Sequence, residues 1–185
     1  MYIEKINTPE DIKKYNINEL EVLAQELREA IINKVSDCGG HLASNLGIVE
    51  LTIALHYVFD APKDKFVFDV SHQTYCHKML TGRKAAFIKK ENYKDVTGFS
   101  NPKESEYDLF ALGHTSTSVS LACGLAKARD LKHDSENVIA VIGDASLDGG
   151  EAFEALNCAA EINSNLIVVI NDNEMSIPEY HGALG

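Results

Sequence analysis

The strongest constraint on the fold is a pair of near-continuous aliphatic runs, Val138–Ile142 and Leu166–Ile170. Strands that are apolar throughout, rather than at alternate positions, are typical of parallel strands covered on both faces. Residues 151–160 between them have the pattern of a helix, so the three segments predict a right-handed βαβ unit. The expected fold class is therefore α/β, with a mostly parallel sheet and helices on both faces.

The rest of the chain continues this alternation of helices and strands. The further expected elements are an amphipathic helix over residues 19–35 that begins near a cap at Asn18 and ends at Gly39-Gly40, a helix over Val49–Val58, a strand over Lys65–Val70 and a buried helix capped by Thr115–Ser118. Residues 82–106 are charged and irregular, which indicates a surface loop, with or without a short helix, that carries little information. Because no repeat or linker is visible, we expect one domain over residues 1–185.

Composition excludes several classes of function. The 185 residues include 17 basic and 28 acidic ones, a net charge of −11, which argues against a nucleic-acid partner. The amino terminus does not resemble a signal peptide, and the longest strongly apolar run, Leu166–Ile170, is too short to span a membrane. Four cysteines without a CxxC pair indicate reduced thiols, so we expect a cytoplasmic protein.

Polar residues follow both aliphatic runs. Gly143-Asp144-Ala145-Ser146 and Asn171-Asp172-Asn173 should meet at one edge, because ligands of parallel α/β sheets bind outside the carboxyl ends of the strands. One carboxylate with amide and backbone oxygens suits a Mg²⁺ ion that takes its other ligands from a diphosphate and water. The simpler alternative is that these residues only cap turns.

These residues also carry a family resemblance. Gly143-Asp144 with Asn171–Ile177 resembles the thiamine-diphosphate motif of transketolase-like enzymes, in the form found in 1-deoxy-D-xylulose-5-phosphate synthases. Further stretches resemble the amino-terminal domain of that family in the same order: Gly39–Gly47, Asp69–Lys78, Ser105–Asp108 and Gly113–Ser118. The resemblance covers essentially the whole chain and implies a thiamine-diphosphate-binding fold.

The resemblance implies a role for each matching residue. Mg²⁺ would be held by Asp144, the side chain of Asn173 and the backbone carbonyl of Met175, and Asn173 would also contact the cofactor. The cofactor would further be bound by Ala145 and Ser146 at its diphosphate and by His72, Gly113, His114 and Thr115. His41 and His72 are the candidate catalytic residues. The family motif has glycine where this chain has Ala145, and a positive φ there would cost about 1 kcal/mol or more.

The activity implied by the resemblance is a thiamine-diphosphate- and Mg²⁺-dependent condensation of pyruvate with glyceraldehyde 3-phosphate, in isoprenoid-precursor and thiamine synthesis. The enzyme would be a homodimeric transferase. In the family, the glutamate that activates the aminopyrimidine ring of the cofactor belongs to a later domain, so we expect residues 1–185 alone to be inactive. The open alternatives are that they are part of a longer enzyme, work with a separate chain or no longer catalyse. The alternatives are a transketolase or split-transketolase subunit and a non-catalytic cofactor-binding fragment.

The remaining histidines and cysteines allow a weaker alternative. A zinc site could be assembled from Cys38, His41, His72, Cys76 and His77, but their spacing matches no zinc finger or ribbon. His56 on an apolar helix and His133 in a charged turn are expected to be structural or solvated.

Overall fold

The computed structural model describes residues 1–172, which divide into two compact units. Unit 1 comprises Met1–Pro62 and His72–Ala111, and unit 2 comprises Lys63–Ser71 and the chain from Leu112 onward. No helix within the described residues is long and apolar enough to cross a membrane. That residues 1–185 form one domain stays a prediction.

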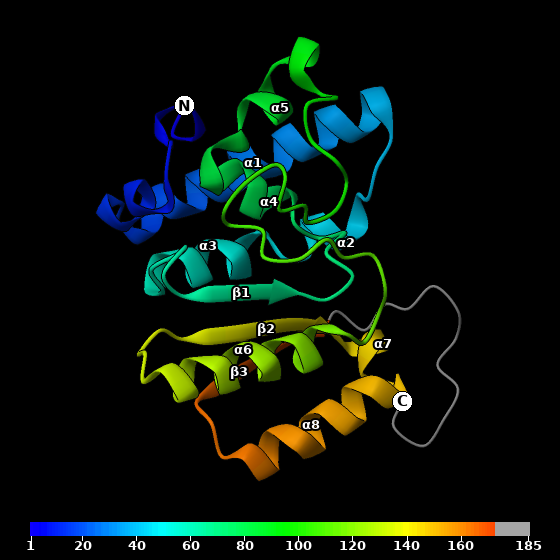
Figure 1. The fold of residues 1–185 in the computed structure, drawn as a ribbon. Helices are drawn as coiled ribbons and strands as arrows, with labels where there is room; N and C mark the ends of the chain where they lie inside the picture. The colour runs from blue at the N-terminus through cyan, green and yellow to red at the C-terminus, as the bar shows by residue number, and fades with distance from the viewer. Residues whose placement is uncertain (173–185) are drawn as a thin grey trace. The chain divides into compact units, whose positions relative to one another are not determined.

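Unit 1 is helical and is built around one long helix (Figure 1). Its elements are η1 (Ile3–Lys5), η2 (Pro9–Lys14), α1 (Ile17–Cys38), α2 (Ala43–Leu46), α3 (Val49–Val58), α4 (Tyr75–Lys78), η3 (Met79–Arg83), α5 (Ala85–Ile88) and η4 (Lys90–Asn92). Helix α1 places Leu23, Leu27 and Ile31 in the core of the unit, where all three are fully buried. The expected helix over Val49–Val58 is confirmed with the same bounds.

The start of α1 differs from the sequence prediction. The cap is Asn16 rather than Asn18, because Asn16 accepts the backbone N–H of Glu19 at 3.1 Å while the Glu19 carboxylate accepts the N–H of Asn16 at 2.8 Å. Both asparagines have a glutamate three residues on, so the capping-box pattern fits twice. The earlier cap lengthens the helix and adds intrahelical hydrogen bonds. The helix ends before Gly39, whose φ of 77° suits glycine, as predicted.

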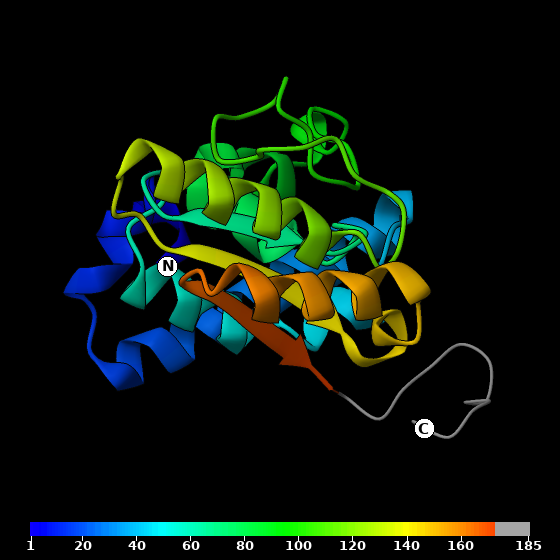
Figure 2. The ribbon, with the colours of Figure 1, turned by 60° about the horizontal axis from the view of Figure 1, so that its bottom comes forward.

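Unit 2 contains the parallel sheet (Figures 1 and 2). Its elements are β1 (Lys65–Phe68), α6 (Ser118–Lys132), β2 (Val138–Gly143), α7 (Asp144–Leu147), α8 (Gly150–Ile162) and β3 (Leu166–Asn171). The strand order is β1-β2-β3 with both pairs parallel, and helices α6 and α8 pack against each other. The predicted α/β class with a parallel sheet is confirmed.

The two aliphatic strands differ in burial. Val138–Ile142 of β2 are fully buried, as expected for a central parallel strand. The expectation that β3 is equally covered is wrong for the described residues: its residues are only half-buried, and Ile170 is 53% exposed. Edge position alone does not explain this, because β1 forms the other edge of the described sheet and Phe66–Phe68 are buried. The register pairs Gly143 with Asn171, so both strands end at one edge.

Candidate functional site

The carboxyl edge of the sheet in unit 2 is organised by Asp69, which follows β1. Its buried carboxylate accepts the backbone N–H of Ser116 and that of Ser118, each at 2.9 Å. The expected capping of this helix by its own hydroxyls is wrong, since the N-cap residue Thr117 makes no side-chain cap bond. One carboxylate accepts two N–H groups and complements the helix dipole, which a hydroxyl does less well.

The backbone on both sides of this carboxylate is strained. Val70 and Ser71 have φ values of 56° and 70°, and Ser116 has a φ of 70°. A left-handed conformation is most unusual for a β-branched residue such as Val70. Such residues cost about 1–3 kcal/mol each and cluster at ligand-binding and active sites. The strain therefore makes this edge the candidate functional site of unit 2.

Two loops expected to bind the cofactor lie together in unit 2. The Ser116 hydroxyl donates to the carbonyl oxygen of Ser146 at 2.8 Å, and the hydroxyls of Thr115 and Ser146 are 2.7 Å apart. Gly113 and His114 are exposed on the same loop, and the His114 Nδ1 atom lies 2.7 Å from the Thr115 carbonyl oxygen. The structure thus brings predicted residues from distant parts of the sequence to one edge.

Asp144 and Ala145 form the first turn of α7, directly after β2. Asp144 is half-buried, and Ala145 is exposed and has no positive φ, so the methyl group does not cause the strain that the substitution for glycine could have brought. Asn173 and Met175 lie outside the described residues. Among residues 1–172, no three His, Cys, Asp or Glu side chains are grouped to hold a metal. Asp144 shares the short helix α7 with Ser146, and a single carboxylate suits Mg²⁺ that takes its other ligands from a diphosphate.

Gly149 is a residue of this edge that sequence reasoning missed. A Cβ atom at position 149 would lie 2.0 Å from Oγ and 2.5 Å from Cβ of Ser116. Only glycine allows the Ser116 loop to approach this closely. The sequence shows two consecutive glycines, Gly149 and Gly150, just after Asp148, but it does not show which of the two the fold requires.

Gly149→Ala is therefore expected to lower the free energy of unfolding by about 1–3 kcal/mol, because the methyl group overpacks against Ser116. Gly150→Ala is the matched control, since a Cβ atom there meets open space. Urea unfolding of both variants checks the prediction. Equal stability of the two variants would contradict it.

The two candidate catalytic histidines lie together in unit 1. The rings of His41 and His72 are 5.4 Å apart between centroids in an edge-to-face arrangement, and Phe99 lies edge-on to His41 at 5.1 Å. Both imidazoles are half-buried. The hydroxyl of Tyr75 accepts the backbone N–H of His41 at 3.3 Å and lies 3.5 Å from its Nδ1 atom.

The zinc alternative finds no support in the described residues. Cys38 is exposed, whereas Cys76 is fully buried in the core of unit 1. Burial raises the pKa of the Cys76 thiol well above its usual value, which opposes the thiolate form that binds zinc. His77 is held instead by two other side chains, His56 at 2.9 Å and Asp108 at 3.2 Å.

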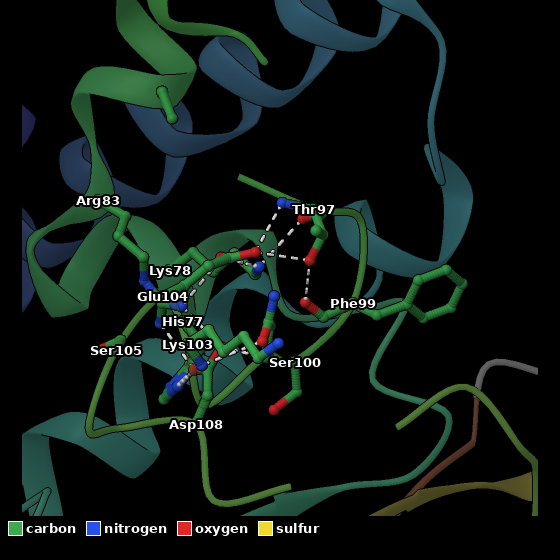
Figure 3. A network of polar contacts seen from close by, with 12 residues as sticks. His77, Lys78, Arg83, Thr97, Phe99, Ser100, Lys103, Glu104, Ser105 and Asp108 are labelled. Atoms are coloured by element: carbon green, nitrogen blue, oxygen red, sulfur yellow. Dashed lines mark hydrogen bonds and ion pairs between the residues drawn. The ribbon is translucent and has the colours of Figure 1, made fainter. Parts of the chain in front are cut away.

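A buried charged network surrounds His77 (Figure 3). Asp108 receives two hydrogen bonds from Arg83, at 2.7 and 2.8 Å, and its carboxylate is almost inaccessible. Burial lowers the pKa of His56 and of His77, so both rings are neutral at pH 7, and His77 remains a hydrogen-bond partner of Asp108. Neighbouring Lys78 is also fully buried and contacts Glu104 at 2.6 Å.

This network corrects the sequence view of residues 82–106. The segment does hold a short helix, α5, together with η4. It is not only a surface loop, because Arg83 binds Asp108 after the segment and Glu104 binds Lys78 before it, and both partners are buried. Thr97 donates its N–H to Glu104 at 2.8 Å and so ties the loop to Lys78. The sequence shows that this segment carries charges of both signs, which makes ion pairs possible, but it does not show which residues pair. His56 is structural, as expected, and His133 is exposed at the end of α6.

These features define an α/β protein whose parallel strands end at one edge of the sheet. Ligands of such proteins bind at this edge, and the architecture is consistent with a thiamine-diphosphate-binding fold. The 1-deoxy-D-xylulose-5-phosphate synthase family model matches residues 3–185. The chain belongs to this family and corresponds to its amino-terminal domain.

Similar proteins agree with this assignment. A 1-deoxy-D-xylulose-5-phosphate synthase of Carboxydothermus hydrogenoformans is 58% identical over 182 residues, which cover 98% of this chain and 29% of the relative. Another from Dictyoglomus turgidum is 56% identical over 184 residues, covering 100% of this chain and 30% of the relative. The chain therefore spans less than a third of the length of these relatives.

Proposed function

We propose that the chain provides the thiamine-diphosphate- and Mg²⁺-binding part of a 1-deoxy-D-xylulose-5-phosphate synthase, which condenses pyruvate with glyceraldehyde 3-phosphate and releases carbon dioxide. The family match over residues 3–185 is the observation that carries this proposal. It favours the synthase over a transketolase or a split-transketolase subunit. Such a transferase would serve isoprenoid-precursor and thiamine synthesis in the cytoplasm, as a homodimer acting on small molecules.

Unit 2 would bind the diphosphate end of the cofactor. Asp144 would ligate Mg²⁺ together with Asn173 and Met175, while the backbone and hydroxyls of Thr115 and Ser146 would face the diphosphate. Support comes from the hydrogen bond between the Thr115 and Ser146 hydroxyls, which shows that the two loops share one edge. The backbone N–H of the strained Ser116 donates to the Asp69 carboxylate at 2.9 Å, which ties this loop to the end of β1.

Unit 1 would contribute the groups that handle protons. Thiamine diphosphate supplies a nucleophilic carbon when bound, whereas the protein orients the reactants, moves protons and excludes water. A half-buried imidazole can donate or accept a proton near neutral pH. We assign this role to His41 and His72, whose rings are already in contact. The carboxylate that activates the aminopyrimidine would come from outside residues 1–185.

Asp144→Ala should lower the affinity for thiamine diphosphate in the presence of Mg²⁺ by about tenfold or more, because the metal loses its one charged protein ligand. Calorimetry on the complete polypeptide that carries these residues measures this directly. The fold should be retained, since the Asp144 side chain is only half-buried.

Asp148→Ala is the control, because Asp148 is exposed at the end of the same short helix. It should bind the cofactor like the parent protein. If Asp144→Ala binds thiamine diphosphate as tightly as the parent protein, the assignment of Asp144 as a ligand of Mg²⁺ is wrong. Normal cofactor binding by the parent without turnover of pyruvate would instead favour the non-catalytic fragment.

A further inference from the structure

Asn45 occupies an unusual position in unit 1. Its side chain is completely buried, yet it lies in α2, a single helical turn between two irregular segments. A buried primary amide must find partners for two N–H groups and one carbonyl oxygen, or it destabilises the fold. Asn45 satisfies all of these groups with backbone atoms from other parts of unit 1.

The three partners are the backbones of the candidate catalytic segments. The Nδ2 atom of Asn45 donates to the carbonyl oxygen of His41 at 2.6 Å and to that of His72 at 2.8 Å. Its Oδ1 atom accepts the backbone N–H of Tyr75 at 2.9 Å. One side chain therefore bridges the two histidine backbones, which lie far apart in the sequence.

Tyr75 connects this bridge to the core. Its ring is 3% exposed and packs against Phe87 at 5.4 Å between centroids, while its hydroxyl contacts the N–H of His41 at 3.3 Å. Gly40 leaves room for that hydroxyl, because a Cβ atom at position 40 would lie 2.7 Å from it. The segment bearing His41 is thus held from two sides, by the amide of Asn45 and by the phenol of Tyr75.

We propose that Asn45 is a positioning residue that sets the relative placement of His41 and His72 for the reaction. This inference rests on the proposed catalytic role of the two histidines. Neither histidine belongs to a helix or strand, so regular hydrogen bonding does not fix its backbone. Small displacements of groups at a reacting centre are costly to the rate, and a shared buried amide prevents them.

Two substitutions test the bridge. Asn45→Asp keeps the shape but replaces the Nδ2 donors by an oxygen that repels both carbonyl groups, and Asn45→Ser keeps a single donor that cannot serve both. Each variant is expected to lower kcat by roughly 10- to 100-fold in the complete polypeptide. Each should also change the rates at which His41 and His72 react with diethyl pyrocarbonate, followed by mass spectrometry of the modified peptides.

Asn16→Ala is the control, because Asn16 caps α1 in the same unit and has no contact with either histidine. It should lose stability and leave kcat and both modification rates unchanged. The proposal is overturned if the Asn45 variants keep kcat within about twofold of the parent. It is also overturned if both modification rates stay as in the parent, or if both Asn45 variants fail to fold where Asn16→Ala folds.

The His72→Ala variant separates this inference from the proposed function. If His72→Ala leaves turnover unchanged, the catalytic role of the histidines fails, whatever Asn45 does. If His72→Ala abolishes turnover while the Asn45 variants behave like the parent, the histidines act in catalysis and only the positioning role of Asn45 is lost.

Discussion

Replacing Asp108 with alanine is expected to lower the free energy of unfolding by about 3–5 kcal/mol, because the largely buried guanidinium of Arg83 loses two charge-assisted hydrogen bonds and keeps a longer ion pair with Glu104, at 3.5 Å. That is a large part of the roughly 5–15 kcal/mol that stabilises a typical domain. The carboxylate also accepts the N–H of Asn101 at 2.8 Å, so the loop that bears Glu104 would loosen as well. Urea unfolding followed by circular dichroism measures the loss.

Glu106→Ala is the matched control for Asp108, since Glu106 is an exposed acidic residue two positions earlier. Its loss should change stability by less than about 0.5 kcal/mol. A comparable effect of the two substitutions would show that net charge, rather than the buried pair, determines stability.

The same carboxylate predicts how stability depends on pH. Burial by itself raises the pKa of Asp108, but hydrogen bonds from His77 and Arg83 outweigh it and hold that pKa well below its usual range. A group with a lowered pKa in the folded state stabilises the protein above its unfolded pKa, about 3.9 for aspartate, and this stabilisation is lost as the pH falls further. The parent should therefore lose more stability than Asp108→Ala between pH 4 and pH 2, by about 1 kcal/mol or more.

The second large effect concerns catalysis. His72→Ala is expected to lower kcat of the complete polypeptide by about 10²-fold or more, because general acid–base catalysis by a placed imidazole contributes at least that much. The free energy of unfolding should change little, since the imidazole is only half-buried. Steady-state release of carbon dioxide from pyruvate, with glyceraldehyde 3-phosphate present, gives the rate.

His133→Asn serves as the control for His72. His133 is exposed and has a φ of 61°, a conformation that asparagine tolerates. This variant should turn over like the parent. Turnover of His72→Ala within a few fold of the parent would leave His72 with a structural role only.

Elements that depend on local pattern were predictable from the sequence. The helix Val49–Val58, the strand pair formed by β2 and β3, and the end of α1 at Gly39 follow from periodicity and from glycine conformation. The motif residues Thr115 and Ser146 lie together at the carboxyl edge of the sheet, and their role there stays a prediction. The helix and its end at a glycine are set by neighbours in the sequence, and the strand pair follows from two apolar runs joined by a helical pattern.

Other features were decided by tertiary contacts. The amide of Asn45 bridges backbones that the sequence separates, Asp69 caps a helix that begins far along the chain, and Gly149 is required only because Ser116 approaches it. In each case one ordinary polar or small residue gains its role from a partner that no local pattern identifies.

The buried charged residues most clearly separate what the sequence determined from what the tertiary structure decided. The sequence determined that residues 82–106 and their neighbours carry charges of both signs, and this composition is typical of a solvated loop. Only the folded chain pairs Arg83 with Asp108 and Lys78 with Glu104 where they are largely shielded from water. Burying an unpaired charge costs far more than leaving it exposed, so these pairings arise only when packing brings opposite charges together.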